Sequence, residues 1–145
     1  MRLRVAQDLF SSFQADAGSR LLLRTLSGVE HERVLDLGCG YGPLGLALAA
    51  VGSHPEVHMV DRDALAVEYS SQNAALNRLA GVETYGSLGY DDVAEPGFDL
   101  VVCNVPGKAG APVIDNLLLG AERHVVPGGV VAMVVVDALA AAVES

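Results

Sequence analysis

The chain has 145 residues, of which 51% are hydrophobic and 19% are charged, and its formal net charge at pH 7 is −9. This length suits one domain with a sizeable core, and the composition excludes a disordered chain. The negative charge argues against a broad phosphate-binding surface, and no apolar run approaches the roughly 20 residues of a membrane span.

A helix is the first element that the sequence predicts, over residues 15–26. Its leucines Leu21, Leu22 and Leu26 are expected to face the core, because they recur at helical spacing.

The next elements lie on either side of a glycine-rich segment. "RVLDLG" (33–38) predicts a short buried strand, and residues 43–52 predict a helix. Pro43 suits the first turn of that helix and Gly52 suits its end. "VHMVD" (57–61) predicts a second strand.

A longer helix is expected after Asp63, whose carboxylate suits the N-cap position. Gly81 is expected to close this helix, and "VETYG" (82–86) predicts a third strand. The apolar residues that keep helical spacing along it are Leu65, Tyr69, Leu76 and Leu79.

The last third of the chain predicts two more strands around a helix. "FDLVVCN" (98–104) predicts the fourth strand and residues 112–124 predict a helix. "VPGG" (126–129) suits a turn, "VVAMVVVD" (130–137) a fifth strand, and the tail from residue 138 the start of another helix.

This alternation predicts an α/β fold, with a doubly wound, Rossmann-like, mostly parallel sheet covered on both faces. We expect a single domain over residues 1–145, in which 1–28 form an N-terminal leader and helix and 29–145 form the Rossmann-like core. Ligands of such sheets bind beyond the carboxyl ends of the strands, at the switch point. The candidate site residues are therefore those that follow each strand.

The glycine loop "LDLGCGYGPLG" fits a dinucleotide-binding pattern in one register. Gly40, Gly42 and Gly45 form G-x-G-x-x-G, and Asp61 lies about 20 residues further on, where such enzymes keep a ribose-binding carboxylate. This register would indicate a nicotinamide-dependent oxidoreductase.

A second register begins with Asp36 at the end of the strand. The alternate glycines that follow it are Gly38, Gly40 and Gly42. An acid there suits a ligand with an ammonium group and repels a pyrophosphate, and Pro43 removes one amide from the helix start. We favour S-adenosylmethionine, whose ribose hydroxyls Asp61 could bind through its two oxygens. A glycine turn that serves packing alone is the third interpretation.

Three blocks of the chain resemble the class I S-adenosylmethionine-dependent methyltransferases. They are similar in particular to the small methyltransferase domain of bacterial 16S ribosomal RNA guanine-N2 methyltransferases. The blocks are "LFSSFQADAGSRLLLRTL" (9–26), "VLDLGCGYGPLGLALA" (34–49) and "FDLVVCNVPGKAG" (98–110), and the resemblance covers most of residues 9–137.

The resemblance implies a set of residues that bind the cofactor, S-adenosyl-L-methionine. These are Asp36, Gly38, Cys39, Gly40, Gly42, Asp61, Arg62, Ser87, Leu88 and Asn104. Leu88 stands where the family often has a polar side chain, so only its backbone is expected to contact the adenine. Asp16 and Ser19 would close over the cofactor or cap a helix.

The catalytic residues that the resemblance implies are Asn104, Val105 and Pro106. The Asn104 side-chain oxygen and the Val105 carbonyl would accept hydrogen bonds from an exocyclic amino group and direct its lone pair at the methyl carbon. Positioning supplies most of the acceleration in such a reaction, and no strong base is required.

The third block departs from the family pattern at two positions. Val105 replaces the first proline of the Asn-Pro-Pro-aromatic motif, and Gly107 replaces the aromatic residue, whose stacking on a base is worth roughly 1–3 kcal/mol. Tyr41 or Tyr90 could replace that ring, and Lys108 could meet a phosphate or a carboxylate.

The chain also stops soon after its fifth strand and lacks the last two strands of the class I methyltransferase fold. Either it is a fragment, or residues 130–137 leave an apolar edge through which two copies associate.

Four functions therefore remain open. The first is methylation of an exocyclic amino nitrogen, on a guanine of ribosomal RNA. The second is methylation of a small molecule or a protein. The third is an inactive adenosylmethionine-binding domain, and the fourth is the oxidoreductase.

The N-terminus lacks the 7–15-residue apolar region of a secretory signal, so a cytoplasmic location without a membrane partner is expected. Cys39 and Cys103 are too far apart for a Cys-x-x-Cys site. No bound metal is expected, since the histidines lack ligand spacing. Loop or surface positions are expected for His31, His54, His58 and His124.

Overall fold

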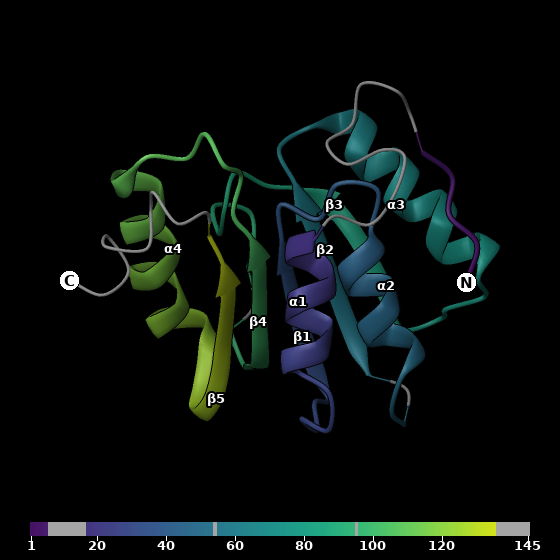
Figure 1. Cartoon of the computed structure of the whole chain (residues 1–145), viewed down its shortest axis with the longest axis horizontal. Helices are drawn as coiled ribbons and strands as arrows, with labels where there is room; N and C mark the ends of the chain where they lie inside the picture. The colour runs from purple at the N-terminus through teal and green to yellow at the C-terminus, as the bar shows by residue number, and fades with distance from the viewer. Residues whose placement is uncertain (6–16, 54, 95, 136–145) are drawn as a thin grey trace.

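The computed structural model describes residues 1–5, 17–53, 55–94 and 96–135. Helices and strands alternate along this part of the chain, except that β4 follows β3 with no helix between them (Figure 1). In chain order they are α1 (Ala17–Thr25), β1 (Arg33–Leu37), α2 (Pro43–Ala50), β2 (Glu56–Asp61), α3 (Ala64–Leu76), β3 (Val82–Gly86), β4 (Phe98–Asn104), α4 (Ala111–His124) and β5 (Val125–Val134).

The strands form one sheet in the order β3-β2-β1-β4-β5, and each neighbouring pair is parallel. The order reverses between β1 and β4, because the chain runs outward to β3 before it returns beside β1. The predicted Rossmann-like fold is thus confirmed. Its switch point lies at the carboxyl ends of β1 and β4.

Two apolar cores cover the two faces of the sheet. Val34 points to the face on which α1 and α2 pack, and the next residue, Leu35, points to the face on which α4 packs. Four consecutive residues of β1 are buried, as expected of a parallel strand with helices on both sides.

The expected apolar face of α3 is only partly confirmed. Leu65, Tyr69 and Leu79 are partly buried and pack against the core clusters, although Leu79 lies beyond the end of the helix. The helix buries mostly small and polar side chains, Ala66, Ser70, Asn73 and Ala74, and leaves Leu76 40% exposed. Asp63 caps its start as predicted and accepts from the Leu65 N–H at 2.9 Å. The helix ends at Leu76 with Asn77 as C-cap, so Gly81 does not close it.

The α1 leucines are only partly as expected. Leu22 and Leu26 are buried, whereas Leu21 is 54% exposed. The predicted start of this helix, residues 15–16, lies outside the described residues.

Strand β5 begins at Val125, five residues earlier than predicted. The "VPGG" stretch expected as a turn is an irregularity inside the strand, because the partner of Phe98 is Val125 and that of Leu100 is already Val130. Gly128 takes φ +83° there, a backbone conformation that favours glycine. The predicted strand end at 136–137 and the helix from 138 lie outside the described residues.

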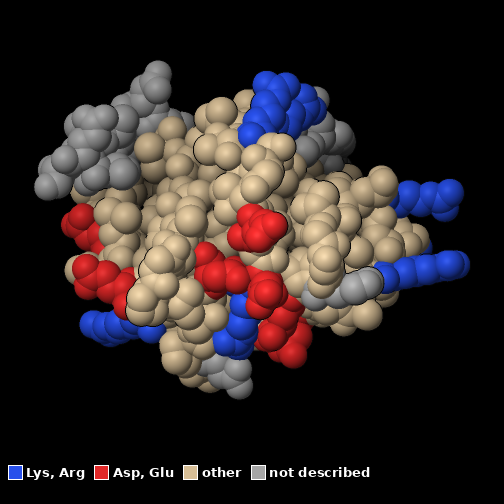
Figure 2. Space-filling view, turned by 90° about the horizontal axis from the view of Figure 1, so that it is seen from below, with Lys and Arg blue, Asp and Glu red and all other residues tan. Residues whose placement is uncertain are grey.

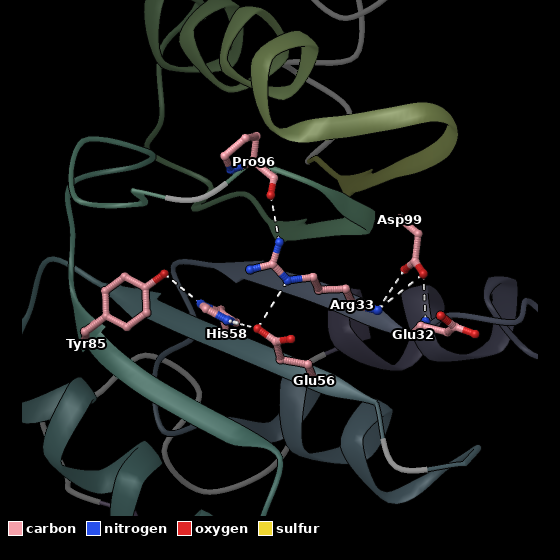
Figure 3. A network of polar contacts seen from close by, with 7 residues as sticks. All are labelled: Glu32, Arg33, Glu56, His58, Tyr85, Pro96 and Asp99. Atoms are coloured by element: carbon pink, nitrogen blue, oxygen red, sulfur yellow. Dashed lines mark hydrogen bonds and ion pairs between the residues drawn. The ribbon is translucent and has the colours of Figure 1, made fainter.

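His58 is a core residue of β2, not the loop or surface residue that was expected. It is 7% exposed, its Nδ1 lies 2.9 Å from the Tyr85 hydroxyl, and its Nε2 lies 2.7 Å from Glu56 Oε1 (Figure 3). The Arg33 guanidinium donates to the same Glu56 oxygen at 3.2 Å and to the Pro96 carbonyl at 2.7 Å.

This network ties together the amino ends of β1, β2 and β4. The Asp99 carboxylate accepts from the backbone N–H groups of Glu32, at 2.7 Å, and of Arg33.

Figure 2 views the molecule from below, and carboxylates gather near the centre of that view. In the described part of the chain, no helix is long and apolar enough to cross a membrane.

Candidate functional site

A cavity of about 760 Å³ opens at the carboxyl ends of β1, β2 and β4, at the switch point of the sheet. Its volume lies in the range of small-molecule and cofactor sites. The predicted site residues that line it are Asp36, Gly38, Cys39, Gly40, Asp61, Arg62, Ser87, Leu88, Asn104 and Pro106.

Two predicted site residues do not line the cavity. Gly42 precedes α2 with φ +95° and faces Leu46 and Met59 in the core. Val105 is 3% exposed and continues the ladder between β4 and β5, since its N–H donates to the Val134 carbonyl at 3.0 Å.

The glycine loop forms one wall of the cavity with bare backbone. Gly38 and Gly40 have φ +67° and +57°, and a Cβ added to either would meet no atom within 4 Å. Side chains there would therefore project into open space that a ligand could fill. Two hydrogen bonds join the loop to β2, from Cys39 N–H to the Val60 carbonyl and from Gly40 N–H to Asp61 Oδ2, both at 2.9 Å.

Asp36 lies beneath this loop and is 2% exposed. Burial raises its pKa from the ordinary 3.8 to about 7, against the lowering effect of a 2.9 Å hydrogen bond from the Gly45 N–H. The neighbouring Asp61 raises it further. A cationic group in the cavity would offset the cost of ionising the buried Asp36. A phosphate would instead add a third negative charge to those of Asp36 and Asp61.

Asp61 and Asp63 make different contacts, and of their expected roles the structure confirms that of Asp63 as the N-cap of α3. Asp61 accepts the Gly40 N–H on one carboxylate oxygen and the Asp63 N–H, at 2.9 Å, on the other. Because each carboxylate oxygen carries two lone pairs, both can still accept from a ligand hydroxyl. Asp63 serves as the cap of α3.

The amides that a dinucleotide-binding loop directs at a pyrophosphate are engaged within the protein. The Gly42 N–H donates to the Cys39 carbonyl at 3.0 Å and the Gly45 N–H to Asp36. Pro43, at the start of α2, has no N–H to offer. The loop geometry therefore disfavours a nicotinamide dinucleotide.

Asn104 sits where β4 meets the beginning of α1. Its Nδ2 donates to the Ser19 hydroxyl at 3.3 Å. Gly18 is so close that an added Cβ would lie 2.6 Å from Asn104 Oδ1 and 2.7 Å from Val134 Cγ1. Ser19 lines the cavity, while Asp16 lies outside the described residues.

The loop after β3 is shaped by Ser87. Its N–H donates to the Asp61 carbonyl at 3.0 Å, and its hydroxyl donates to the Gly89 carbonyl at 2.8 Å and accepts from the Asp92 N–H. Ser87 is thus mostly engaged with its own loop. Leu88 borders the cavity and is 60% exposed.

Sequence reasoning missed the wall that α4 contributes. Val113, Asn116 and Leu117 line the cavity from that helix. Their i, i+3, i+4 spacing, directly after the Asn-Val-Pro-Gly stretch, is the signal that could have found them.

The two tyrosines considered as replacements for an aromatic at Gly107 lie differently. Tyr90 does not face the cavity: its hydroxyl donates to the Leu117 carbonyl at 3.0 Å and its ring stacks on His124 with centroids 4.6 Å apart. Tyr41 borders the cavity, but it is 1% exposed and packs against Ala66. Lys108 is exposed and also borders the cavity.

Cys39 and Cys103 both line the cavity and are both buried. Burial, and next the charge of Asp36, raise the pKa of Cys103 to about 12 and the pKa of Cys39 well above its ordinary value. Both are therefore neutral thiols, not nucleophiles. Within the described ranges, no group of three His, Cys, Asp or Glu side chains could hold a metal ion.

The sequence of the chain is similar to a known protein family and to individual proteins. The model of the family described as methyltransferase small domain matches residues 1–143. The chain is 36% identical over 123 residues to YbxB of Bacillus subtilis (strain 168). The matched segment covers 83% of this chain and 61% of that protein.

Two further proteins that the chain resembles have names that mention ribosomal RNA. Ribosomal RNA large subunit methyltransferase G of Shewanella oneidensis is 33% identical over 138 residues, covering 88% of this chain and 36% of that one. The structure of a T. thermophilus 16S rRNA N2-guanine methyltransferase with AdoMet and guanosine superposes with a TM-score of 0.76 and 33% identity, covering 88% and 36%. The chain thus spans less than two thirds of the length of these proteins.

Proposed function

The chain belongs to the methyltransferase small domain family, and we propose that it transfers a methyl group from S-adenosylmethionine to an exocyclic amino nitrogen of a guanine in ribosomal RNA. The observation that carries this proposal is the position of Asn104, which borders the same cavity as the bare glycine loop. One cavity would thus hold both the methyl donor and the amino acceptor.

The cavity wall fits the proposed cofactor. Gly38 and Gly40 leave open space along the loop, Asp61 offers free lone pairs for two ribose hydroxyls, and Asp36 offers a buried carboxylate for an ammonium group. We assign the adenine to the loop of Ser87 and Leu88. When bound, S-adenosylmethionine would supply a methyl group on a sulfonium.

The role proposed for Asn104 is orientation of the acceptor. Its Oδ1 would accept a hydrogen of an amino group, which turns the nitrogen lone pair towards the cavity. Val105 is buried and does not line the cavity, so the expected contact of its carbonyl with the acceptor is left out of this role. The Val105 N–H is held by the Val134 carbonyl, so the backbone at this turn is fixed by the sheet. Positioning of this kind needs no catalytic base.

Ribosomal RNA is proposed as the substrate from the similarity to enzymes that act on it. Arg62 and Lys108 are exposed and border the cavity, where they would meet phosphates on either side of the target nucleotide.

The test is methyl transfer to ribosomal RNA by the parent chain and by Asn104→Ala. We expect the variant to lose about a hundredfold in kcat, because orientation of the acceptor is lost, while its affinity for S-adenosylmethionine in calorimetry changes little. Equal turnover of variant and parent would refute the role of Asn104. No heat with S-adenosylmethionine, in a folded sample, would refute the proposed function itself.

A second candidate is methylation of a small molecule or a protein. Gly107 favours it, because the turn after Asn104 carries no ring on which a flipped base could stack. Labelled methyl transferred to a protein or metabolite fraction, with none in ribosomal RNA, would establish it. Cofactor binding without transfer to any fraction would indicate an inactive binding domain.

A further inference from the structure

The N-terminal residues run alongside α3 and are held there by two asparagines (Figure 1). Asn77 accepts the Arg2 N–H at 2.8 Å on its Oδ1 and donates from its Nδ2 to the Arg2 carbonyl. Asn73 does the same for Arg4, with bonds of 2.5 and 2.8 Å. Each side-chain amide thus pairs with one backbone residue, as a neighbouring strand would.

The spacing explains why this pairing repeats. Residues 2 and 4 of an extended chain lie about 6.6 Å apart, and positions 73 and 77 of a helix lie about 6 Å apart along its axis. Two asparagines four residues apart therefore meet alternate residues of the N-terminal segment, residues 1–5. The pairing reads only main-chain atoms, so it depends little on the side chains of Arg2 and Arg4, which are exposed.

Asn73 differs from Asn77 because it also reaches the glycine loop. It is 0% exposed, and its Nδ2 donates to the Tyr41 carbonyl at 2.8 Å as well as to Arg4. Both amide hydrogens and the amide oxygen are therefore engaged. Asn77 uses its second amide hydrogen on the Asn73 carbonyl of its own helix.

Apolar packing also connects the N-terminal segment to the glycine loop. Leu3 lies between the two paired residues and contacts the cluster of Tyr41 and Ala66. Both of these residues border the cavity. The N-terminal segment thus supports the loop through an apolar contact and a polar one.

We propose that Asn73 is a positioning residue that joins residues 2–4 to the glycine loop and thereby sets the shape of that loop for the cofactor. This inference rests on the proposed function of the cavity. Loss of the Asn73 amide would remove the hydrogen bonds that it makes to the Tyr41 carbonyl and to the Arg4 backbone, while the bonds between the loop and β2 would remain.

The sharpest variant acts on the N-terminal segment itself. Arg4→Pro removes the N–H that Asn73 accepts, at a position whose own side chain is exposed, and the Tm measured beside the Kd reports any effect on the contact of Leu3 with the core. Arg4→Ala is its matched control, since it removes the same charge and keeps the N–H. Asn73→Asp keeps the acceptor and removes both donors, and Asn77→Ala loosens Arg2 without touching the loop.

The measurements are calorimetric Kd for S-adenosylmethionine and Tm without ligand. We expect Arg4→Pro to weaken binding roughly fivefold and Asn73→Asp tenfold or more, with Arg4→Ala near the parent value and Asn77→Ala weakened less than Arg4→Pro. At saturating cofactor, kcat of Arg4→Pro should stay close to that of the parent, because the acceptor side is unaffected.

Three outcomes would overturn the proposal. One is an equal Kd for Arg4→Pro and Arg4→Ala. Another is a fall in Tm for Asn73→Asp and Arg4→Pro while the Kd stays that of the parent, which would leave Asn73 a stability residue only. Binding by none of the proteins, the parent included, would instead refute the proposed function and this role with it.

Discussion

Asp36 is a carboxylate held where its protonated form is favoured. Its pKa is about 7 in the folded chain, against an ordinary 3.8, because burial outweighs the Gly45 hydrogen bond. Between these two values the folded state holds one more proton than the unfolded state. The contribution of Asp36 to the free energy of unfolding therefore falls as the pH rises from about 4 to 7 and is constant above.

We expect this fall in the Asp36 contribution with rising pH to be measurable when Asp36→Asn is compared with the parent. The free energy of unfolding of the variant minus that of the parent should increase between pH 4 and 7 and then level off, as measured by urea denaturation. Cofactor affinity of the parent should improve over the same range, since an ammonium group prefers the ionised acid, whereas that of the variant should stay weak and flat. A pH-independent difference in stability would contradict the assignment.

Gly18 is a second residue whose replacement has a defined result. A methyl group there would lie 2.6 Å from Asn104 Oδ1 and 2.7 Å from Val134, so Asn104 or α1 must shift. We expect Gly18→Ala to lower kcat by roughly tenfold or more while the Kd of the cofactor changes little.

The matched control is Gly86→Ala, since a Cβ at position 86 has its nearest neighbour 3.9 Å away. Turnover by Gly18→Ala that equals turnover by this control would show that Asn104 tolerates the displacement.

Among the elements, β1 and β2 are joined by the Arg33–Glu56–His58 contacts. The hydrogen bond with His58, and then Arg33, lowers the pKa of Glu56 below its ordinary 4.5. The stabilisation is therefore complete at neutral pH and is lost as the pH falls through the lowered pKa. The Glu56 side chain is 50% exposed, so the effect should weaken in high salt.

Glu56→Gln tests this contribution against Glu83→Gln, which removes an exposed carboxylate from the neighbouring strand β3. We expect Glu56→Gln to lower Tm more than the control at pH 7, and the two variants to converge in acid. Equal Tm values at pH 7 would mean that the network adds nothing measurable.

Two strands have the bounds that the sequence predicts, although their burial differs. Residues 98–104 are a short apolar run that ends at turn residues, and the strand they form is mostly buried. Residues 82–86 form an outer strand in which no residue is buried, and Gly86 marks its end. The polar part of the buried face of α3 was missed because it depends on what lies beneath: Asn73 is buried as a polar residue only through its partners at positions 4 and 41.

At the scale of the whole molecule, the site could be predicted where residues follow strands. Asp36, Asp61 and Asn104 lie at or next to the last residue of their strands, and the parallel sheet brings them to one cavity. Contacts between distant segments could not be predicted, such as the close approach of Gly18 to Asn104, because no local pattern in the sequence records which segments pack together. The β5 bulge was missed for the same reason, since it arises from pairing with β4.

The β5 edge of the sheet has exposed apolar residues through which two copies of the chain could associate. Among the residues that the structure describes, β5 is the outer strand of the sheet on this side, and Val130, Val131 and Leu21 beside it are 40%, 37% and 54% exposed. An apolar groove between α1 and β5 includes all three. An open apolar edge of this kind tends to pair with another chain.

We expect light scattering to show self-association of the 145-residue chain, which Val131→Lys should reduce. Leu119→Lys is the control, because it places a lysine at a 60% exposed apolar residue on α4, away from the groove. A monodisperse monomer of the parent would contradict the prediction.

The chain contains two cysteines, and both border the one cavity described as the candidate site. Because Cys39 and Cys103 are buried and their raised pKa values keep them protonated, a thiol reagent reaches them only when the cavity opens. The native sequence thus carries its own chemical reporters. The rate at which a coloured disulfide reagent consumes these thiols measures opening of this region, and any molecule seated in it becomes visible as a slower reaction, without a label and without turnover.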